Sequence, residues 1–208
     1  MTGVATAEKS DNETSDQLKN TLRYLASRMY AKPGPGRSKK LVGPGALASL
    51  RRMTPDDLDS LSLPELRDLI VDLEERLPPG SPHLAMVPGE GWRLDHMGVK
   101  RWALLIGGMA RMSPLHYNQN GQSLGKALAL TGYSEERFVR LLRHAPDTSG
   151  FADAWRRATD WLAIHAMAIS WSEVHDLILR TDNPDEVRRQ VAMSYFSQAE
   201  REQRKKKT

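Results

Sequence analysis

The sequence of 208 residues contains no cysteine. Disulfide bonds, thiolate nucleophiles and cysteine-ligated zinc are therefore excluded, and a reducing cytoplasm is the expected location. Long apolar runs are also lacking. The longest, Trp102 to Met109, is too short to cross a bilayer, and the polar N-terminus has no signal-peptide core. We therefore expect a cytoplasmic protein that has no membrane partner.

Acidic residues are missing from two long stretches, one between Asp16 and Asp56 and one between Asp95 and Glu135. The net charge of the whole chain is only +4, so the uneven distribution of charge is better evidence for an anionic partner than the net charge is. Uncompensated positive charge raises the local potential and favours a phosphate backbone as partner. A solvated basic surface that serves solubility is the alternative explanation.

Catalytic motifs are absent as well. None of the six histidines belongs to an HExxH pair, and no GxSxG motif occurs. The segment 34–39 has prolines where a phosphate loop needs free backbone amides. The segment 121–127 is one residue short of a Walker A spacing and lacks a Ser or Thr after Lys126. We predict no catalytic residue, no metal, no cofactor and no enzymatic activity.

Apolar residues recur at helical spacing through most of the chain, and no stretch of alternating β-branched residues predicts a strand. The fold class is therefore all-α, either a compact helical bundle or two helical lobes, with disordered termini. The predicted helices begin at Asp16 and Thr54 and also cover residues 46–53, 62–77, 94–111, 123–131, 134–145, 149–168, 171–180 and 184–198. Residues 78–91 and 118–122 are predicted loops. Ser170 and Glu173 predict a capping box at the start of the helix over 171–180. Gly107 and Gly108 inside an apolar helix predict the close approach of another helix.

The chain divides by composition into four parts. Residues 1–15 are polar and predict a disordered tail. Residues 16–115 form an N-terminal helical part with a basic linker over 32–45 and an acidic helix over 62–77. Residues 116–198 form a C-terminal helical part, and residues 199–208 form a mobile basic tail.

The candidate nucleic-acid contacts are the basic residues with few acidic neighbours. Arg51 and Arg52 stand first because no acid lies within a helical turn before them. Arg137, Arg140 and His144 share one helix face, although Arg140 can pair with Glu136. Arg156 and Arg157 have Asp153 and Asp160 available, which leaves a purely structural role open. The complete candidate set is Lys39, Lys40, Arg51, Arg52, Lys126, Arg137, Arg140, Arg143, Arg156 and Arg157. Trp155, Trp171, Tyr195 and Phe196 fit a core better than base-stacking platforms.

Three segments in this order resemble the small subunit of the type I-E CRISPR Cascade complex, the CasB family. The first is Gly45-Ala46-Leu47-Ala48-Ser49-Leu50-Arg51-Arg52. The second joins Ser123-Leu124-Gly125-Lys126-Ala127-Leu128-Ala129 to Ser134-Glu135-Glu136-Arg137-Phe138 and Leu141-Leu142-Arg143. The third runs from Trp155-Arg156-Arg157 through Ser170-Trp171 to Val187-Arg188-Arg189 and Tyr195-Phe196. The chain departs from the family pattern at Lys126, where an arginine is expected, which keeps the charge but loses the planar fork.

The resemblance implies a non-catalytic helical subunit that is present in two copies in a crRNA-guided complex. Its implied partners are the complex's backbone and large subunits and a second copy of itself. It is also implied to hold the target and displaced DNA strands of the R-loop, in antiviral defence. A free-standing helical DNA-binding regulator remains the alternative, and a helical scaffold that binds only protein is a third interpretation. Neither is decided by the residues alone.

Overall fold

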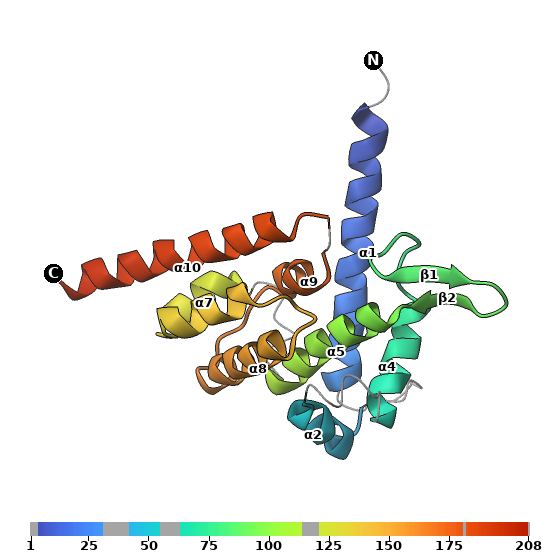
Figure 1. Ribbon diagram of the computed structural model, residues 1–208, viewed down its shortest axis with the longest axis horizontal. Coiled ribbons are helices and arrows are strands. Elements are labelled where there is room, and N and C mark those ends of the chain that lie inside the picture. The colour runs from blue at the N-terminus through green and yellow to red at the C-terminus, as the bar shows by residue number, and fades with distance from the viewer. Residues whose placement is uncertain (1–3, 31–41, 55–62, 114–120, 181, 208) are drawn as a thin grey trace.

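Figure 1 shows a computed structural model of the protein, in which residues 4–30, 42–54, 63–113, 121–180 and 182–207 are described. The elements in chain order are α1 (Val4–Tyr30), α2 (Pro44–Arg52), α4 (Pro64–Glu74), β1 (Leu84–Val87), β2 (Gly91–Leu94), α5 (His96–Arg111), α6 (Leu124–Leu130), α7 (Glu135–Arg143), α8 (Ser149–Ile164), α9 (Trp171–Leu179) and α10 (Pro184–Lys206). The fold is mostly helical, as predicted.

The helix α5 is the centre of the fold, with α2, α4 and the hairpin to one side and α7, α8 and α10 to the other (Figure 1). Its residues from Trp102 to Ala110 are buried on every face, because the sequence there is apolar nearly all round. The buried side chains of the described residues form one continuous cluster. The protein is therefore one bundle around α5 rather than two separate lobes.

Gly107 and Gly108 let two helices approach α5 closely, as the sequence predicts. A Cβ atom at Gly107 would lie 2.9 Å from the Met53 methyl group beside α2. A Cβ atom at Gly108 would lie 2.8–3.0 Å from the indole of Trp155 on α8. The Trp155 Nε1–H donates to the carbonyl of Leu104 at 3.0 Å, so the buried ring is fixed on α5.

A two-stranded antiparallel hairpin begins in the segment 78–91, which the sequence predicts as a loop, and ends at Leu94, where the sequence predicts the start of a helix. β1 pairs with β2 from Leu84 opposite Leu94 to Val87 opposite Gly91. The Glu90 N–H donates to the Val87 carbonyl at 3.0 Å across Pro88-Gly89, and Gly89 has a φ of 83°. The prediction of no strand is wrong here because four-residue strands are too short to show alternation, although Pro-Gly is a turn signal.

Two helix boundaries also differ from the sequence prediction. α1 begins at Val4 rather than at Asp16, since extending an existing helix costs far less than starting one. The side chains of residues 1–15 lie outside the description, and the disordered tail stays a prediction. α10 continues to Lys206 instead of ending at residue 198. Most of the linker 32–45, the helix predicted from Thr54 and most of the loop at 118–122 lie outside the described residues.

The acidic helix α4 buries its predicted apolar face, with Leu66, Leu69 and Leu73 fully enclosed. Two of its acidic residues contact other elements of the protein. Asp72 forms an ion pair with Arg28 of α1 at 2.7 Å, and the carboxylate of buried Glu74 accepts a hydrogen bond from the Leu94 N–H of β2 at 2.9 Å. This helix therefore connects α1 and the hairpin. No helix within the described ranges is both long and apolar enough to span a membrane.

Replacement of Gly108 with Ala should destabilise the protein by about 1–3 kcal/mol, because the new methyl group meets a fixed ring rather than the end of a flexible side chain. Gly45→Ala in α2 is the matched control. Its Cβ would meet nothing within 4 Å, so the variant should be neutral or more stable. Urea denaturation measures both. Equal unfolding free energies for Gly108→Ala and the wild type would show that the α5–α8 contact is not tightly packed.

Candidate nucleic-acid interface

The C-terminal ends of α2 and α5 are joined by two arginines that cap each other's helix. The Arg51 Nε–H at the end of α2 donates to the Ala110 carbonyl near the end of α5 at 2.9 Å. In return, the Arg111 Nη2–H of α5 donates to the Met53 carbonyl just past α2 at 2.8 Å. Each cation therefore donates to a carbonyl at the negative end of a helix dipole. We call this arrangement the arginine clasp.

The arginine clasp changes the interpretation of the first-ranked site residues. Arg51 also donates from Nη2 to the Ser113 hydroxyl at 3.3 Å, so two of its five N–H groups are directed at its own chain. Arg52 donates from Nε to the Ala48 carbonyl one turn earlier at 3.2 Å. Arg51 has no acidic neighbour in the sequence, but in the structure its guanidinium group is bonded to a backbone carbonyl instead. A phosphate contact by either residue stays a prediction.

Arg111 is a cation that the sequence did not single out, and it also reaches α8. Its side chain is only 7% exposed, and its Nε lies 3.7 Å from the Asp160 carboxylate. Burial lowers the pKa of Arg111, while Asp160 opposes that shift and nearby Arg156 adds to it. Asp160, which the sequence offered as a partner of the α8 arginines, is thus used by α5.

A hollow between α7 and α8 brings three of the predicted arginines together. We call it the α7–α8 groove, and its lining is Tyr133, Arg137, Arg140, His144, Gly150, Asp153, Ala154 and Arg157. The predicted face of Arg137, Arg140 and His144 is confirmed, because all three point to this hollow and Phe138 behind them is fully buried. Arg157 joins them from α8. This convergence of two helices could not be seen in either helix alone.

The groove is electrostatically positive around a buried phenol. Burial raises the pKa of Tyr133, whereas the guanidinium groups of Arg137, Arg157 and Arg140 act to lower it. Neither Arg137 nor Arg157 has a carboxylate within ion-pair distance in the part of the chain that the structure describes. Asp153 is the acid that lines the groove, and it lies 3.7 Å from Arg156. An anion entering the groove would therefore meet uncompensated guanidinium groups.

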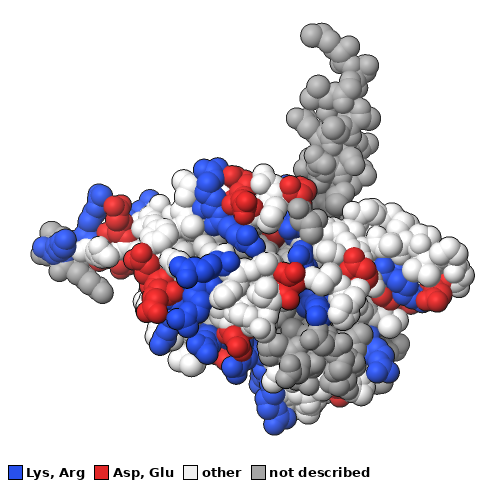
Figure 2. All heavy atoms as spheres, in the orientation of Figure 1, with Lys and Arg blue, Asp and Glu red and all other residues white. Residues whose placement is uncertain are grey.

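Figure 2 shows Lys and Arg side chains gathered over α7 and α8, with acidic side chains at the outer margin and a few among them. Elsewhere on the described surface, several arginines are paired with acids. Arg180 contacts Asp182 at 2.8 Å, Arg188 contacts Asp185 at 3.4 Å and Arg189 contacts Glu186 at 2.7 Å. Such exposed pairs leave less charge available for a ligand. The groove therefore differs from these surfaces by its unpaired charge rather than by arginine content.

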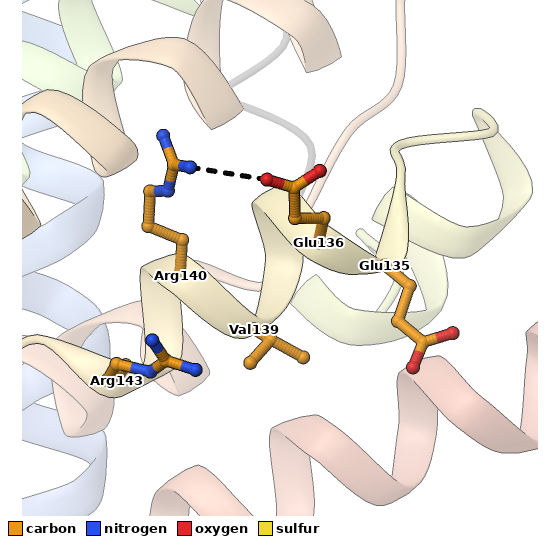
Figure 3. A pocket seen from close by; sticks show the side chains of 5 residues that line it. All are labelled: Glu135, Glu136, Val139, Arg140 and Arg143. Atoms are coloured by element: carbon orange, nitrogen blue, oxygen red, sulfur yellow. Dashed lines mark hydrogen bonds and ion pairs between the residues drawn. The ribbon is translucent and has the colours of Figure 1, made fainter.

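The adjoining flank of α7, which shares Arg140 with the groove, carries mixed charge. A second hollow there is lined by Glu135, Glu136, Val139, Arg140 and Arg143, and Figure 3 shows the acids in the first turn and Arg143 in the last. The Arg140 Nη2 donates to Glu136 at 3.3 Å, so the predicted pair is confirmed. This order of charges suits the helix dipole. Arg143 lines this second hollow and not the α7–α8 groove.

The remaining candidate contacts are not gathered at the groove. Arg156 is paired with Asp153 on α8 itself. Lys126 lies half-buried on α6, next to Gly125, where a Cβ would clash with the Val191 carbonyl of α10. Lys39 and Lys40 lie outside the described residues. Of the ten candidates, the structure therefore brings together Arg137, Arg140 and Arg157.

Three of the four aromatic residues that the sequence places in the core, Trp155, Trp171 and Tyr195, are buried as predicted. Phe196 contacts the rings of Phe138 and Tyr195 edge-on but is 41% exposed, so it is not a core residue. Tyr195 stacks on Phe138 with ring centroids 3.9 Å apart, and its hydroxyl donates to the Tyr133 carbonyl at 2.6 Å. In the lining of the groove itself, the ring of Tyr133 is buried, so the described lining offers no exposed Phe, Tyr or Trp side chain on which a base could stack. Across all the described residues, no group of three or more His, Asp and Glu side chains could hold a metal ion.

Glu173 is a further polar residue whose role the sequence misassigned. The Ser170 hydroxyl accepts the Glu173 N–H, as in the predicted capping box. The Glu173 carboxylate, however, accepts the Leu124 N–H at the start of α6 instead of closing the box. Burial raises the pKa of Glu173, and the Leu124 hydrogen bond opposes this shift. The residue thus holds the start of α6 against α9.

Comparison with known families gives one match. Residues 46–196 match the family model described as CRISPR-associated protein Cse2. No curated protein and no solved structure matches the chain. The matched range begins within α2, contains the central helix α5 and both helices of the α7–α8 groove, and ends within α10.

Replacement of Arg51 with Ala should lower stability by about 1 kcal/mol, because the Ala110 carbonyl loses a charged donor at a helix end. For a chain of this size, the melting temperature should fall by about 2–4 °C. Arg52→Ala is the matched control, since its bond is local and exposed, and it should stay within about 0.5 kcal/mol of the wild type. Thermal melts compare the two variants. Equal melting temperatures would refute a capping role for Arg51.

Proposed function

Because the chain belongs to the CRISPR-associated Cse2 family, the small subunit of the type I-E Cascade complex, we propose that it binds the sugar-phosphate backbone of DNA through the α7–α8 groove. In this proposal it is a non-catalytic subunit that helps to hold the target and displaced strands of the R-loop. Its protein partners would be the complex's backbone and large subunits and a second copy of the chain.

The observation that carries the proposal is the unpaired state of Arg137 and Arg157. Two helices that are separate in sequence direct these side chains into one hollow. Neither lies within ion-pair distance of a carboxylate of the described residues, since Asp153 of the lining is paired with Arg156. Keeping like charges together is unfavourable for the isolated protein. An anionic ligand removes this cost, so the arrangement fits binding better than stability. Guanidinium groups also match phosphate oxygens in geometry.

Such contacts can matter in an R-loop because strand exchange is nearly balanced in free energy. The guide–target heteroduplex is about as stable as the duplex that it replaces, so backbone contacts from a protein can tip the equilibrium. The groove offers charge without an exposed aromatic platform among the described residues, which supports binding that is indifferent to sequence. A free-standing regulator would need a helix whose side chains read base edges, and no described helix presents such a row.

The double variant Arg137→Ala/Arg157→Ala should bind single-stranded DNA more weakly than the wild type at every sequence tested. Each lost phosphate contact should reduce the slope of log K against log salt by about 0.7 for a single strand. Its melting temperature should be close to that of the wild type, because both side chains are exposed. Fluorescence anisotropy over a salt series measures the slope.

The matched control is Arg188→Ala/Arg189→Ala on α10. It removes the same charge, but from side chains that are paired with Asp185 and Glu186. Its salt slope should stay near that of the wild type. If both double variants lose the same slope, binding depends on net charge alone and the groove is not the interface. Sequence-dependent loss would instead favour a regulator.

A further inference from the structure

The end of α10 extends beyond the segment that matches the family model. The match ends at residue 196, whereas α10 continues as a helix to Lys206. We call residues 199–207 the C-terminal arm. It follows the last turn in which α10 is anchored to the body, where Tyr195 bonds to Tyr133 and Gln198 is 7% exposed. Figure 1 shows this end of α10 extending past α7.

Ala199 at the start of the C-terminal arm packs against the core, and beyond it the arm carries ion pairs and hydrogen bonds between side chains of α10 itself. Glu200 pairs with Arg204 at 3.6 Å, and Glu202 accepts from both Gln198 and Lys205 at 2.9 Å. None of its described side chains is buried. A helix that is polar on all sides gains no energy from packing and depends on such short-range pairs. Beyond Ala199, packing against the core therefore does not stabilise the arm in the free protein.

The charge of the arm is strongly positive. Its basic residues are Arg201, Arg204, Lys205, Lys206 and Lys207, and its acids are Glu200 and Glu202, so five minus two leaves a net charge of +3. This is most of the net charge of +4 of the whole chain. The arm lacks the apolar stripe that a helix needs to dock on a protein groove or a bilayer. A polyanion is the partner that its chemistry fits.

We propose that the C-terminal arm is a second contact for the nucleic-acid backbone, engaging phosphates of the same strand that occupies the α7–α8 groove. The proposal rests on the proposed function, because it assumes that a strand lies in the groove. Tyr195 adjoins the groove through Tyr133. From Tyr195 to Lys207 the helix advances about 18 Å at 1.5 Å per residue. That distance corresponds to about five nucleotides at 3.4 Å each, so one continuous strand can reach both surfaces.

The test replaces with glutamine two described cations of the arm that form no ion pair with other described residues, Arg201→Gln and Lys207→Gln. Glutamine preserves helix propensity, and the pairs of Glu200 and Glu202 stay intact. With a long single-stranded oligonucleotide, the salt slope should fall by about 0.7 for each cation that contacts a phosphate. Circular dichroism should show unchanged helix content. A second variant, Glu200→Gln, removes an acid of the arm and should strengthen binding.

The matched control neutralises two cations elsewhere, Arg188→Gln and Arg189→Gln, which are paired with Asp185 and Glu186. It has the same net charge as the arm variant, and it should keep the wild-type salt slope. Equal losses in the control and the arm variant would overturn the proposal. So would an unchanged slope in the arm variant together with failure to join the complex, which would make the arm a protein contact.

The groove and the arm fail independently in these measurements. If the groove variant Arg137→Ala/Arg157→Ala loses slope and the arm variant does not, the proposed function stands and the arm proposal falls. If the salt slope falls in the arm variant alone, the groove proposal is wrong. The proposal that one strand contacts both the groove and the arm is then wrong as well. Loss in each variant, with an additive loss in the combined variant, supports both sites.

Discussion

The contact between Trp155 of α8 and Gly108 of α5 is the packing constraint on which the groove depends. The indole lies where any side chain at position 108 would stand, and its Nε1–H is bonded to the Leu104 carbonyl. This contact fixes the rotation of α8, and hence the side of the helix on which Arg157 emerges. α7 packs on α8 in turn. Core packing therefore sets the direction in which the groove arginines point, and so determines where their positive charge lies on the surface.

The partners of the arginines, more than their number, distinguish the surfaces of this protein. In the arginine clasp, Arg51 and Arg111 are directed at backbone carbonyls and join helix ends. On α10, Arg188 and Arg189 are paired with acids one turn away. In the α7–α8 groove, Arg157 meets neither kind of partner among the described residues. One residue type thus serves as helix cap, as surface ion pair and, in our proposal, as anion contact, according to what its neighbours offer.

The helical fold and the basic face of α7 could be predicted from sequence because both arise from periodicity within one element. The pairing of Arg140 with Glu136 followed from the same short-range rule. The convergence of Arg157 on that face could not be predicted, since it depends on how α8 packs. The capping role of Arg51 was missed because its partner at Ala110 is distant in sequence. The hairpin was missed because its strands are shorter than one clear alternation.

Site-specific photocrosslinking in the assembled complex tests the central claim most directly. A photoreactive amino acid at position 144, on the lining of the α7–α8 groove, is compared with one at position 85, on the exposed outer face of the hairpin. In a complex that has opened a target duplex, position 144 should crosslink to DNA and position 85 should not. Efficient R-loop formation with no DNA crosslink from position 144, or with DNA crosslinks from position 85 alone, would contradict the account.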